Sequence, residues 1–155
     1  LMSALGVAAG KIRRISNDLL PHVLEELGLC DALIFLTAEM NKAGKVNFTF
    51  KSNKCDLSQL EKGEELSVYR IVQELGSNIL KYADATKVLI ELKGSKTSLV
   101  ISVSDDGNGI IPVKDDRSES LGLKNIESRI QYINGEINRR LGKDKGTIVT
   151  ITKVY

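Results

Sequence analysis

Tryptophan is absent from this 155-residue chain, which also has only three phenylalanines, four tyrosines and two methionines. So few aromatic side chains offer no stacking platform for single-stranded nucleic acid, and two methionines do not make a Met-rich binding groove. An excess of charge of one sign is missing too, because the formal net charge is only +2. The charge therefore gives no reason to expect nucleic acid or an anionic membrane surface as a partner.

Long hydrophobic runs and cysteine motifs are also lacking. No apolar run approaches the roughly 20 residues that a membrane-spanning helix needs, and no secretory signal pattern is present. The two cysteines, Cys30 and Cys55, match no metal-ligand spacing and suggest no disulfide framework, so we expect reduced thiols in a cytosolic setting. A hydrophobic content of 42% and a charged content of 27% are ordinary for one soluble globular domain.

The periodicity of apolar residues predicts helices and strands that mix without strict alternation. Helical spacing occurs over residues 5–20, 31–42, 68–83 and 121–133. Strand-like segments occur over residues 45–51, 87–92, 98–104, 136–141 and 147–154. The last four segments form two pairs joined by short Gly-containing links, which predicts two antiparallel hairpins. A layer of helices on a mostly antiparallel sheet fits this order best.

The N-terminal helices have recognisable limits. Pro21 should end or interrupt the first helix, because it lacks a backbone N–H and crowds the preceding turn. Asp31 is the predicted N-cap of the second helix, and Gly44 its stop. In this second helix the apolar residues that should face the core are Leu33, Leu36 and Met40.

The helix over residues 68–83 carries two faces of different chemistry. Its apolar stripe consists of Val68, Val72, Leu75 and Ile79. At about 100° per residue, Glu74, Asn78 and Lys81 fall within roughly a 60° arc away from that stripe. A carboxylate, a carboxamide and an ammonium group one turn apart could serve an anion and its metal ion. The alternative is a solvated helix face with a favourable spacing of Glu and Lys.

A long polar loop is predicted over residues 105–120, and it opens with Asp105-Asp106-Gly107-Asn108-Gly109 directly after a strand. Glycines there let a ligand approach the backbone, and a carboxylate can accept a hydrogen bond from an amine. Alternatively, an Asp and Gly cluster simply makes turns. A calcium loop of the EF-hand type fits poorly, because Ser104 and Asp115 stand at two ligand positions and a strand precedes the loop.

Two further segments could contribute to a binding site. Leu121-Gly122-Leu123 is predicted to open the helix after the loop, where free backbone N–H groups next to a glycine favour phosphate. Gly146-Thr147 begins the last strand, where a small residue and a hydroxyl could line a pocket.

In this order the segments resemble the ATP-binding catalytic domain of sensor histidine kinases, within the superfamily shared with gyrase, heat-shock chaperones and mismatch-repair ATPases. QELGSNILKYA resembles the N box of that family and SDDGNGI its first glycine box. SLGLKNIESRI resembles the second glycine box, and GKDKGTIVTI the last box. Upstream, KIRRISNDLLPHVLEELGLCDAL is similar to the end of the dimerisation helix and its linker in the subgroup of nitrate and lipid-fluidity sensors.

The resemblance implies an α+β fold of the Bergerat type. This is a two-layer α/β sandwich with about three helices on a mixed, mostly antiparallel sheet, and with ATP between the N-box helix and the loop. It also implies two parts of the chain. Residues 1–22 would be the end of the dimerisation helix and its linker, and residues 23–155 would be the catalytic domain.

The resemblance also implies roles for individual residues. On the N-box helix, Asn78 would coordinate Mg²⁺, Glu74 would orient a metal-bound water or act as a base, and Lys81 would lie near the phosphates. Asp105 would accept from the adenine amino group. The remaining site residues would be Gly107 and Gly109 beside the base, Gly122 and Leu123 on the phosphate side, and Thr147 near adenine. Residues 115–120 would belong to a mobile ATP lid.

Three features depart from the family pattern. Tyr82 stands where His is common, and Ser120 replaces the first Gly of the usual G-x-G-L. The only histidine, His22, follows Pro21, whereas the family's phosphate acceptor lies on an earlier helix before an acidic residue. We therefore expect His22 to be a surface or hinge residue, and the chain to be a fragment of a longer protein.

The implied enzyme is a protein histidine kinase. With ATP and Mg²⁺, it would transfer the γ-phosphoryl group to a His on a separate dimerisation helix of a homodimer, for relay to a response regulator. Autophosphorylation of this chain alone is not expected, and neither is nucleic acid as a partner. The location would be cytoplasmic, as a domain of a membrane-associated sensor. The alternative functions are a non-catalytic nucleotide-binding module and, less favoured, an ATPase clamp like the chaperones.

Overall fold

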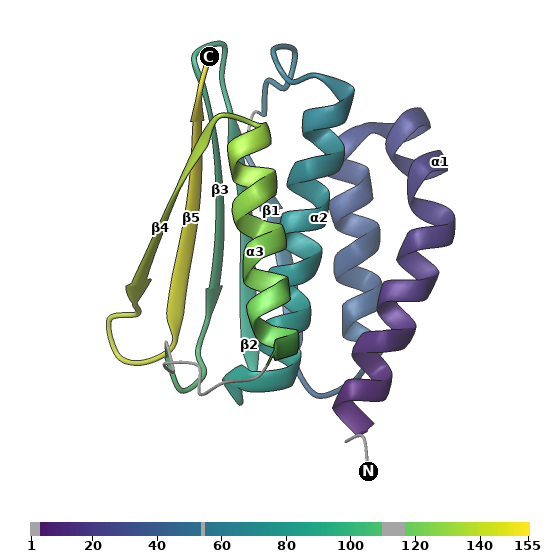
Figure 1. Cartoon of the computed structure of the whole chain (residues 1–155), viewed down its shortest axis with the longest axis vertical. Coiled ribbons are helices and arrows are strands. Elements are labelled where there is room, and N and C mark those ends of the chain that lie inside the picture. The colour runs from purple at the N-terminus through teal and green to yellow at the C-terminus, as the bar shows by residue number, and fades with distance from the viewer. Residues whose placement is uncertain (1–3, 54, 110–116) are drawn as a thin grey trace.

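Two layers make up the molecule (Figure 1). Within residues 4–53, 55–109 and 117–155, the ranges that this computed structural model describes, three helices cover one face of a five-stranded sheet. The side chains are described from His22 onward, except at residues 117–120 within the last helix. This arrangement confirms the predicted two-layer α+β fold.

The sheet has the strand order β1-β2-β3-β5-β4. Its strands are β1 (Asn47–Ser52), β2 (Lys87–Gly94), β3 (Ser98–Asp105), β4 (Gly135–Leu141) and β5 (Thr147–Val154). β1 runs parallel to β2, and every other neighbouring pair is antiparallel. Both predicted hairpins, β2–β3 and β4–β5, are therefore confirmed, and so is the mixed, mostly antiparallel character of the sheet.

Alternation along the strands puts the core between the two layers. In β3, Leu99, Ile101 and Val103 are buried, while the serines between and beside them are half-buried on the other face. The helices supply the opposite side of the core with residues such as Leu36 and Ile126, both 0% exposed. Burial of such side chains removes apolar surface from water and is the main term that holds the layers together.

The first helix, α1 (Ala4–Asn41), is broken at Gly28, whose backbone has φ 80 and ψ 178. The predicted end at Pro21 is wrong, because the helical backbone continues through that residue. Proline removes one N–H donor from a helix, whereas the left-handed φ of Gly28 takes the chain off the helical path altogether. Figure 1 shows the ribbon turning back within α1.

The second half of α1 resumes at Leu29, so Asp31 lies inside the helix and is not its N-cap. The predicted inward residues of this half are confirmed, because Leu33, Leu36 and Met40 are all 0% exposed. None of the described helices combines the length and hydropathy that crossing a bilayer requires.

A side-chain amide joins the end of α1 to the edge of the sheet. The Asn41 carboxamide donates from Nδ2 to the Phe48 carbonyl at 2.9 Å and accepts from the Phe48 N–H at 2.7 Å. It therefore takes up both backbone groups that β1 presents there on its outer edge, as a neighbouring strand would.

The central helix, α2 (Lys62–Asn78), begins six residues before the predicted position. The N–H of Glu61 donates to the Glu64 carboxylate at 3.1 Å, which satisfies one of the free donors at this end. The apolar stripe is confirmed, since Val68, Val72 and Leu75 are buried and Ile79 packs against the core. From Ile79 to Ala83 the chain forms a π-helix, η1, so the predicted unbroken α-helix is wrong over these residues.

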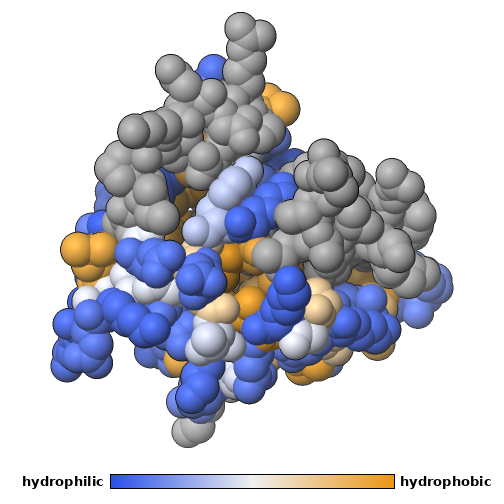
Figure 2. All heavy atoms as spheres, turned by 90° about the horizontal axis from the view of Figure 1, so that it is seen from below, coloured by the Kyte–Doolittle hydropathy of each residue, from blue (hydrophilic) through white to orange (hydrophobic). Residues whose placement is uncertain are grey.

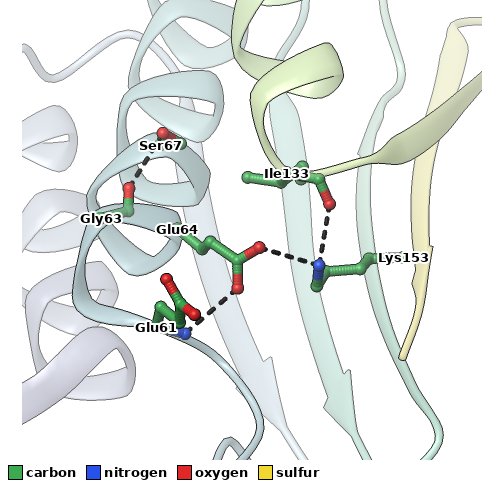
Figure 3. Close-up of polar contacts among 6 residues, drawn as sticks. All are labelled: Glu61, Gly63, Glu64, Ser67, Ile133 and Lys153. Carbon is green, nitrogen blue, oxygen red and sulfur yellow. Dashed lines mark hydrogen bonds and ion pairs between the residues drawn. The ribbon is translucent and has the colours of Figure 1, made fainter.

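A buried ion pair joins the upper ends of three elements (Figure 3). Lys153 in β5 donates from Nζ to Glu64 Oε1 of α2 at 2.8 Å and to the Ile133 carbonyl after α3 at 2.9 Å. The side chains of Lys153 and Glu64 are only 9% and 12% exposed. The pair lies at the end of the sandwich where α2 begins and β5 ends.

The last helix, α3 (Arg117–Tyr132), begins within the segment predicted as a loop. Residues 117–120 are helical, so the predicted loop over residues 105–120 is wrong for these four, while the lid over residues 115–120 stays a prediction. Asp115 and the side chain of Ser120 lie outside the described residues. Of the predicted inward positions, Ile126 and Ile130 are buried and Leu123 is half-buried.

Candidate functional site

The candidate residues gather at one end of the sandwich, the lower end in Figure 1. There β3 ends, β5 begins, η1 ends and α3 begins. Figure 2 views the molecule from this end and shows hydrophobic residues near the centre with hydrophilic residues around them.

The Asp105 carboxylate lies half-buried at the end of β3. Its Oδ1 accepts a hydrogen bond from the Gly107 N–H at 2.8 Å. Burial raises the pKa of Asp105, while the backbone N–H groups of Gly107 and Thr147 act in the opposite direction. The carboxylate therefore sits between the loop after β3 and the first residue of β5, where it can accept a further hydrogen bond.

The neighbouring Asp106 holds the loop in place. It accepts from the Thr86 N–H at 2.7 Å, the Thr86 hydroxyl at 2.6 Å and the Lys87 N–H at 2.8 Å. These hydrogen bonds, that of the Thr86 hydroxyl first, lower the pKa of Asp106 to about 2. No role was predicted for Asp106, because two adjacent aspartates give no sign of which one faces the start of β2.

Gly107 lets the loop lie against the end of η1. A Cβ built at this position would lie 2.1 Å from the Ala83 carbonyl oxygen, and no side chain fits there. The next residue, Asn108, donates its N–H to the same oxygen at 2.8 Å. The N-box segment and the first glycine box are thus joined through their backbones.

Gly109 and Gly146 allow the turn before β5 to lie against the end of β3 and the loop that follows it. Both have a left-handed φ, of +84 and +81, which strains other residues. A Cβ on Gly146 would lie 1.9 Å from the Asp105 carbonyl oxygen, and one on Gly109 would lie 3.0 Å from Leu141 Cδ2. Gly146 was predicted only as a small residue that could line a pocket, and Leu141 was not predicted as a site residue. The glycine in GKDKGT was the available signal for Gly146.

Glu74 and Gly122 bring α2 and α3 together. A Cβ built on Gly122 would lie 2.5 Å from Glu74 Oε1, so the carboxylate fills the space beside the glycine backbone. The prediction that Leu121-Gly122-Leu123 opens the helix is wrong, because α3 begins at Arg117. The Gly122 N–H therefore lies beyond the first four residues, whose N–H groups are the free donors of a helix.

The remaining N-box residues lie on the same stretch of chain. Asn78 is the last residue of α2 and is half-buried, one turn after Glu74. Lys81 is exposed within η1. A π-helix bonds each C=O to the N–H five residues further on, so its rotation per residue is smaller than that of an α-helix. The predicted arc assumed an α-helical rotation throughout, so it does not apply to Lys81.

His22 is not part of this constellation of residues. Its side chain is 78% exposed, and its Nε2 lies 3.6 Å from Glu26 Oε1, one turn further along α1. This exposure agrees with the prediction of a surface residue.

The donor set fits a magnesium ion that is shared with phosphate groups. Among the residues that the structure describes, no group of three or more His, Cys, Asp and Glu is arranged to hold a metal ion. Mg²⁺ usually takes one or two protein oxygens and completes its shell with water and substrate phosphates, rather than using a cage of protein ligands. The Asn78 amide oxygen and the Glu74 carboxylate are of the right chemical type for this.

Comparisons with known proteins support one family. Residues 63–154 match the family described as histidine kinase-, DNA gyrase B-, and HSP90-like ATPase. The Bacillus subtilis sensor histidine kinase ComP is 32% identical over 135 residues, which cover 86% of this chain and 17% of ComP. The Staphylococcus carnosus oxygen sensor histidine kinase NreB is 31% identical over 140 residues, which cover 90% of this chain and 40% of NreB. The chain thus spans well under half the length of either relative.

The fold has solved counterparts. The histidine kinase domain of the blue-light activated histidine kinase of Erythrobacter litoralis aligns with a TM-score of 0.70 at 22% identity, covering 94% of this chain and 74% of that domain. At this identity the likeness concerns the fold alone. The match over residues 63–154 runs from the N-box helix to the last strand, through all four motif segments. The chain belongs to the histidine kinase-, DNA gyrase B-, and HSP90-like ATPase family.

Proposed function

We propose that the chain is the ATP-binding catalytic domain of a two-component sensor histidine kinase. It would transfer the γ-phosphoryl group of ATP to a histidine on a dimerisation helix, for relay to a response regulator. The observation that carries this proposal is the half-buried Asp105 carboxylate, which lies where the first glycine box, the last box and the end of the N box meet. The names of ComP and NreB support the same activity.

Asp105 is the proposed acceptor for the adenine amino group. A carboxylate offers about four lone-pair positions, so the hydrogen bonds from backbone N–H groups leave capacity for one amine donor. Partial burial strengthens such a bond because little water competes for it. Thr147 would lie beside the base, and Gly107 and Gly109 would keep side chains away from it.

The phosphates would lie toward α2 and α3. Asn78 is the proposed ligand of Mg²⁺, and Glu74 would orient a water on the metal or accept a proton. Gly122 and Leu123 would form the α3 side of this region, since the missing side chain of Gly122 leaves room for the Glu74 carboxylate. Lys81 would add positive charge near the phosphates. When bound, the metal ion would neutralise the charge that develops on the transferred group.

Catalysis by such a site would rest on positioning and on charge neutralisation. The chain holds the nucleotide, and the acceptor histidine must come within about 3–3.5 Å of the γ-phosphorus, in line with the leaving oxygen. We propose that residues 1–22 belong to the dimerisation helix and that residues 23–155 form the catalytic domain. The burial of Leu24, which is 8% exposed, supports a core that begins near residue 23.

We also propose a cellular setting for the whole protein. It would be a homodimer through its dimerisation helices and a membrane-associated sensor, with this domain in the cytoplasm. The response regulator would be its protein partner.

Titration calorimetry with ATP or ADP and Mg²⁺ tests the nucleotide site. The parent chain should bind, and Asp105→Asn should weaken binding roughly tenfold, the effect of about 1.4 kcal/mol expected for one hydrogen bond to a charged group. Asp31→Asn is the matched control, because it makes the same change at an exposed position in α1. A parent chain that binds neither nucleotide would exclude this function.

A further inference from the structure

The fold brings together the two cysteines, which are 25 positions apart in the sequence. Cys30 lies in α1, two residues after the Gly28 break, and Cys55 lies in the irregular connection between β1 and α2. Cys30 Sγ is 3.7 Å from the Ser52 hydroxyl oxygen. The Cys55 thiol interacts with the side chains of both Cys30 and Ser52, so the three groups form one cluster.

The position of Cys55 is fixed by the β2–β3 hairpin. The Asp56 N–H donates to the Gly94 carbonyl at 3.1 Å, which ties the connection to the end of β2. A Cβ on Gly94 would lie 2.5 Å from the Asp56 carbonyl oxygen and 2.9 Å from Cys55 Sγ. Only glycine fits at this position, and its backbone forms the wall against which the thiol rests.

The surroundings of the cluster suit thiols better than a metal ion. Both cysteines are free, half-buried and packed against the hydrophobic core. Within the part of the chain that the structure describes, no third Cys, His, Asp or Glu joins them as a metal-binding group. Burial raises the pKa of the Cys55 thiol, so Cys55 is protonated at neutral pH and its reactivity increases as the pH rises.

We propose that Cys30 and Cys55 form a reversible intramolecular disulfide when the chain meets a peroxide. One thiolate attacks hydrogen peroxide, the O–O bond breaks, and the sulfur becomes a sulfenic acid while the released hydroxide takes up a proton to form water. The second thiol then attacks the sulfenic sulfur, the S–S bond forms, and the hydroxyl group leaves with a proton as a second water. In total, two thiols and one peroxide give one disulfide and two waters. The thiols are oxidised by two electrons and the peroxide is reduced.

This bond would connect the residues just after the Gly28 break to the connection that leads into α2. It would restrict movement of the second half of α1 against the edge of the sheet. The cluster lies at the end of the sheet where β2 ends and α2 begins, opposite the candidate nucleotide site. The disulfide would therefore form whether or not the chain binds a nucleotide.

Thiol labelling of the whole chain tests the proposal. The reduced chain should take two maleimide labels by intact mass, and the peroxide-treated chain should take none. Dithiothreitol should then restore both labelling sites. A peptide map without reductant should show the Cys30 and Cys55 peptides joined in the monomer. The midpoint of thermal unfolding should rise by several degrees on oxidation, because the cross-link restricts the unfolded chain.

The matched variants are Cys30→Ser and Cys55→Ser. After a brief, stoichiometric peroxide treatment, each variant should keep its one labelling site. Its unfolding midpoint should be the same before and after the treatment. Any of three results would overturn the proposal. The treated parent could still take two labels, it could form cross-links only between molecules, or it could form sulfinic acid without a disulfide. The peptide map uses the parent chain, so this test stands even if a variant fails to fold.

Discussion

Gly122 in α3 faces the Glu74 carboxylate in α2 so closely that a Cβ on the glycine would lie 2.5 Å from Glu74 Oε1. The two residues are 48 positions apart in the sequence and belong to the N box and the second glycine box. A side chain at residue 122 would meet this carboxylate first, and the backbone of Gly122 does not have the positive φ that favours glycine.

Replacing Gly122 by Ala should disturb the site more than the fold. Alanine favours a helix interior over glycine by up to about 1 kcal/mol, while the added methyl group pushes the flexible end of Glu74 aside. We expect an unfolding free energy within about 1 kcal/mol of the parent and a clearly weaker affinity for ATP with Mg²⁺. Chemical denaturation and titration calorimetry measure the two quantities.

A double-mutant cycle identifies the cause of this effect. In a Glu74→Ala background the carboxylate is gone, so Gly122→Ala should have little further effect on ATP affinity. Equal effects of Gly122→Ala in both backgrounds would contradict the contact as the cause.

Asp106 should make stability depend on pH in acid. Its pKa in the folded chain is about 2, below the ordinary value of 3.8. A lowered pKa means that Asp106 stabilises the fold above pH 4, and that this contribution is lost as the pH falls toward 2. Asp106→Asn should lower the free energy of unfolding by about 1 kcal/mol at pH 7, a modest value because solvent screens this partly exposed carboxylate. Thermal unfolding from pH 7 to pH 2 should show the two chains converging, and a constant difference would contradict this origin.

Lys153→Met should destabilise the fold strongly, although Lys153 lies far from the candidate site. The substitution leaves the Glu64 carboxylate, which is 12% exposed, without its cation. Breaking a buried pair from one side costs about 3 kcal/mol or more. Denaturation with urea measures the change, and the exposed Lys96→Met is the matched control. Adding Glu64→Gln should recover part of the loss; no recovery would mean that packing, and not the unpaired charge, explains the effect.

The chain alone should not form a phosphohistidine with ATP labelled at its γ-phosphate. Its only histidine, His22, is 78% exposed on α1 and faces Glu26. Added dimerisation helices that carry an acceptor histidine should gain an acid-labile, alkali-stable label. Asn78→Ala should reduce this transfer more than Glu74→Gln, because it loosens the metal ion. Label on His22 would contradict this placement of the acceptor, and good ATP binding without transfer would favour a non-catalytic module.

Local sequence patterns were enough to predict most of the helices and strands. The strand β5, at Thr147–Val154, has the predicted limits, because alternation and a Gly-containing turn define it without help from distant residues. The break at Gly28 was missed in favour of Pro21, since a glycine can occupy a helix and only the tertiary contacts decide whether it leaves. The π-helix from Ile79 was missed for a similar reason, because the spacing of apolar residues does not show which carbonyl each N–H will reach.

The candidate site was predictable as a set of motifs but not as a set of contacts. The motif order placed Glu74 and Gly122 in one site, yet their spacing along the chain gave no sign that they touch. The pairing of Asp106 with Thr86 depends on how β2 and β3 are aligned, with Val88 opposite Asp105. Such contacts follow from the packing of whole elements, and a single sequence does not contain them in a local form.

The Asn41 amide also affects whether a strand of another molecule can pair with the edge of this sheet. A sheet grows when an incoming chain pairs with the free backbone groups of an edge strand. On β1 both outward groups of Phe48 are already bonded to Asn41, so a new strand would have to displace this side chain before it could pair there. The other edge strand, β4, carries the exposed residues Glu136, Arg139 and Arg140, and charges of this kind discourage strand addition. Strand addition is thus opposed by a different means at each edge, by the bonded backbone groups of Phe48 on one side and by charge on the other.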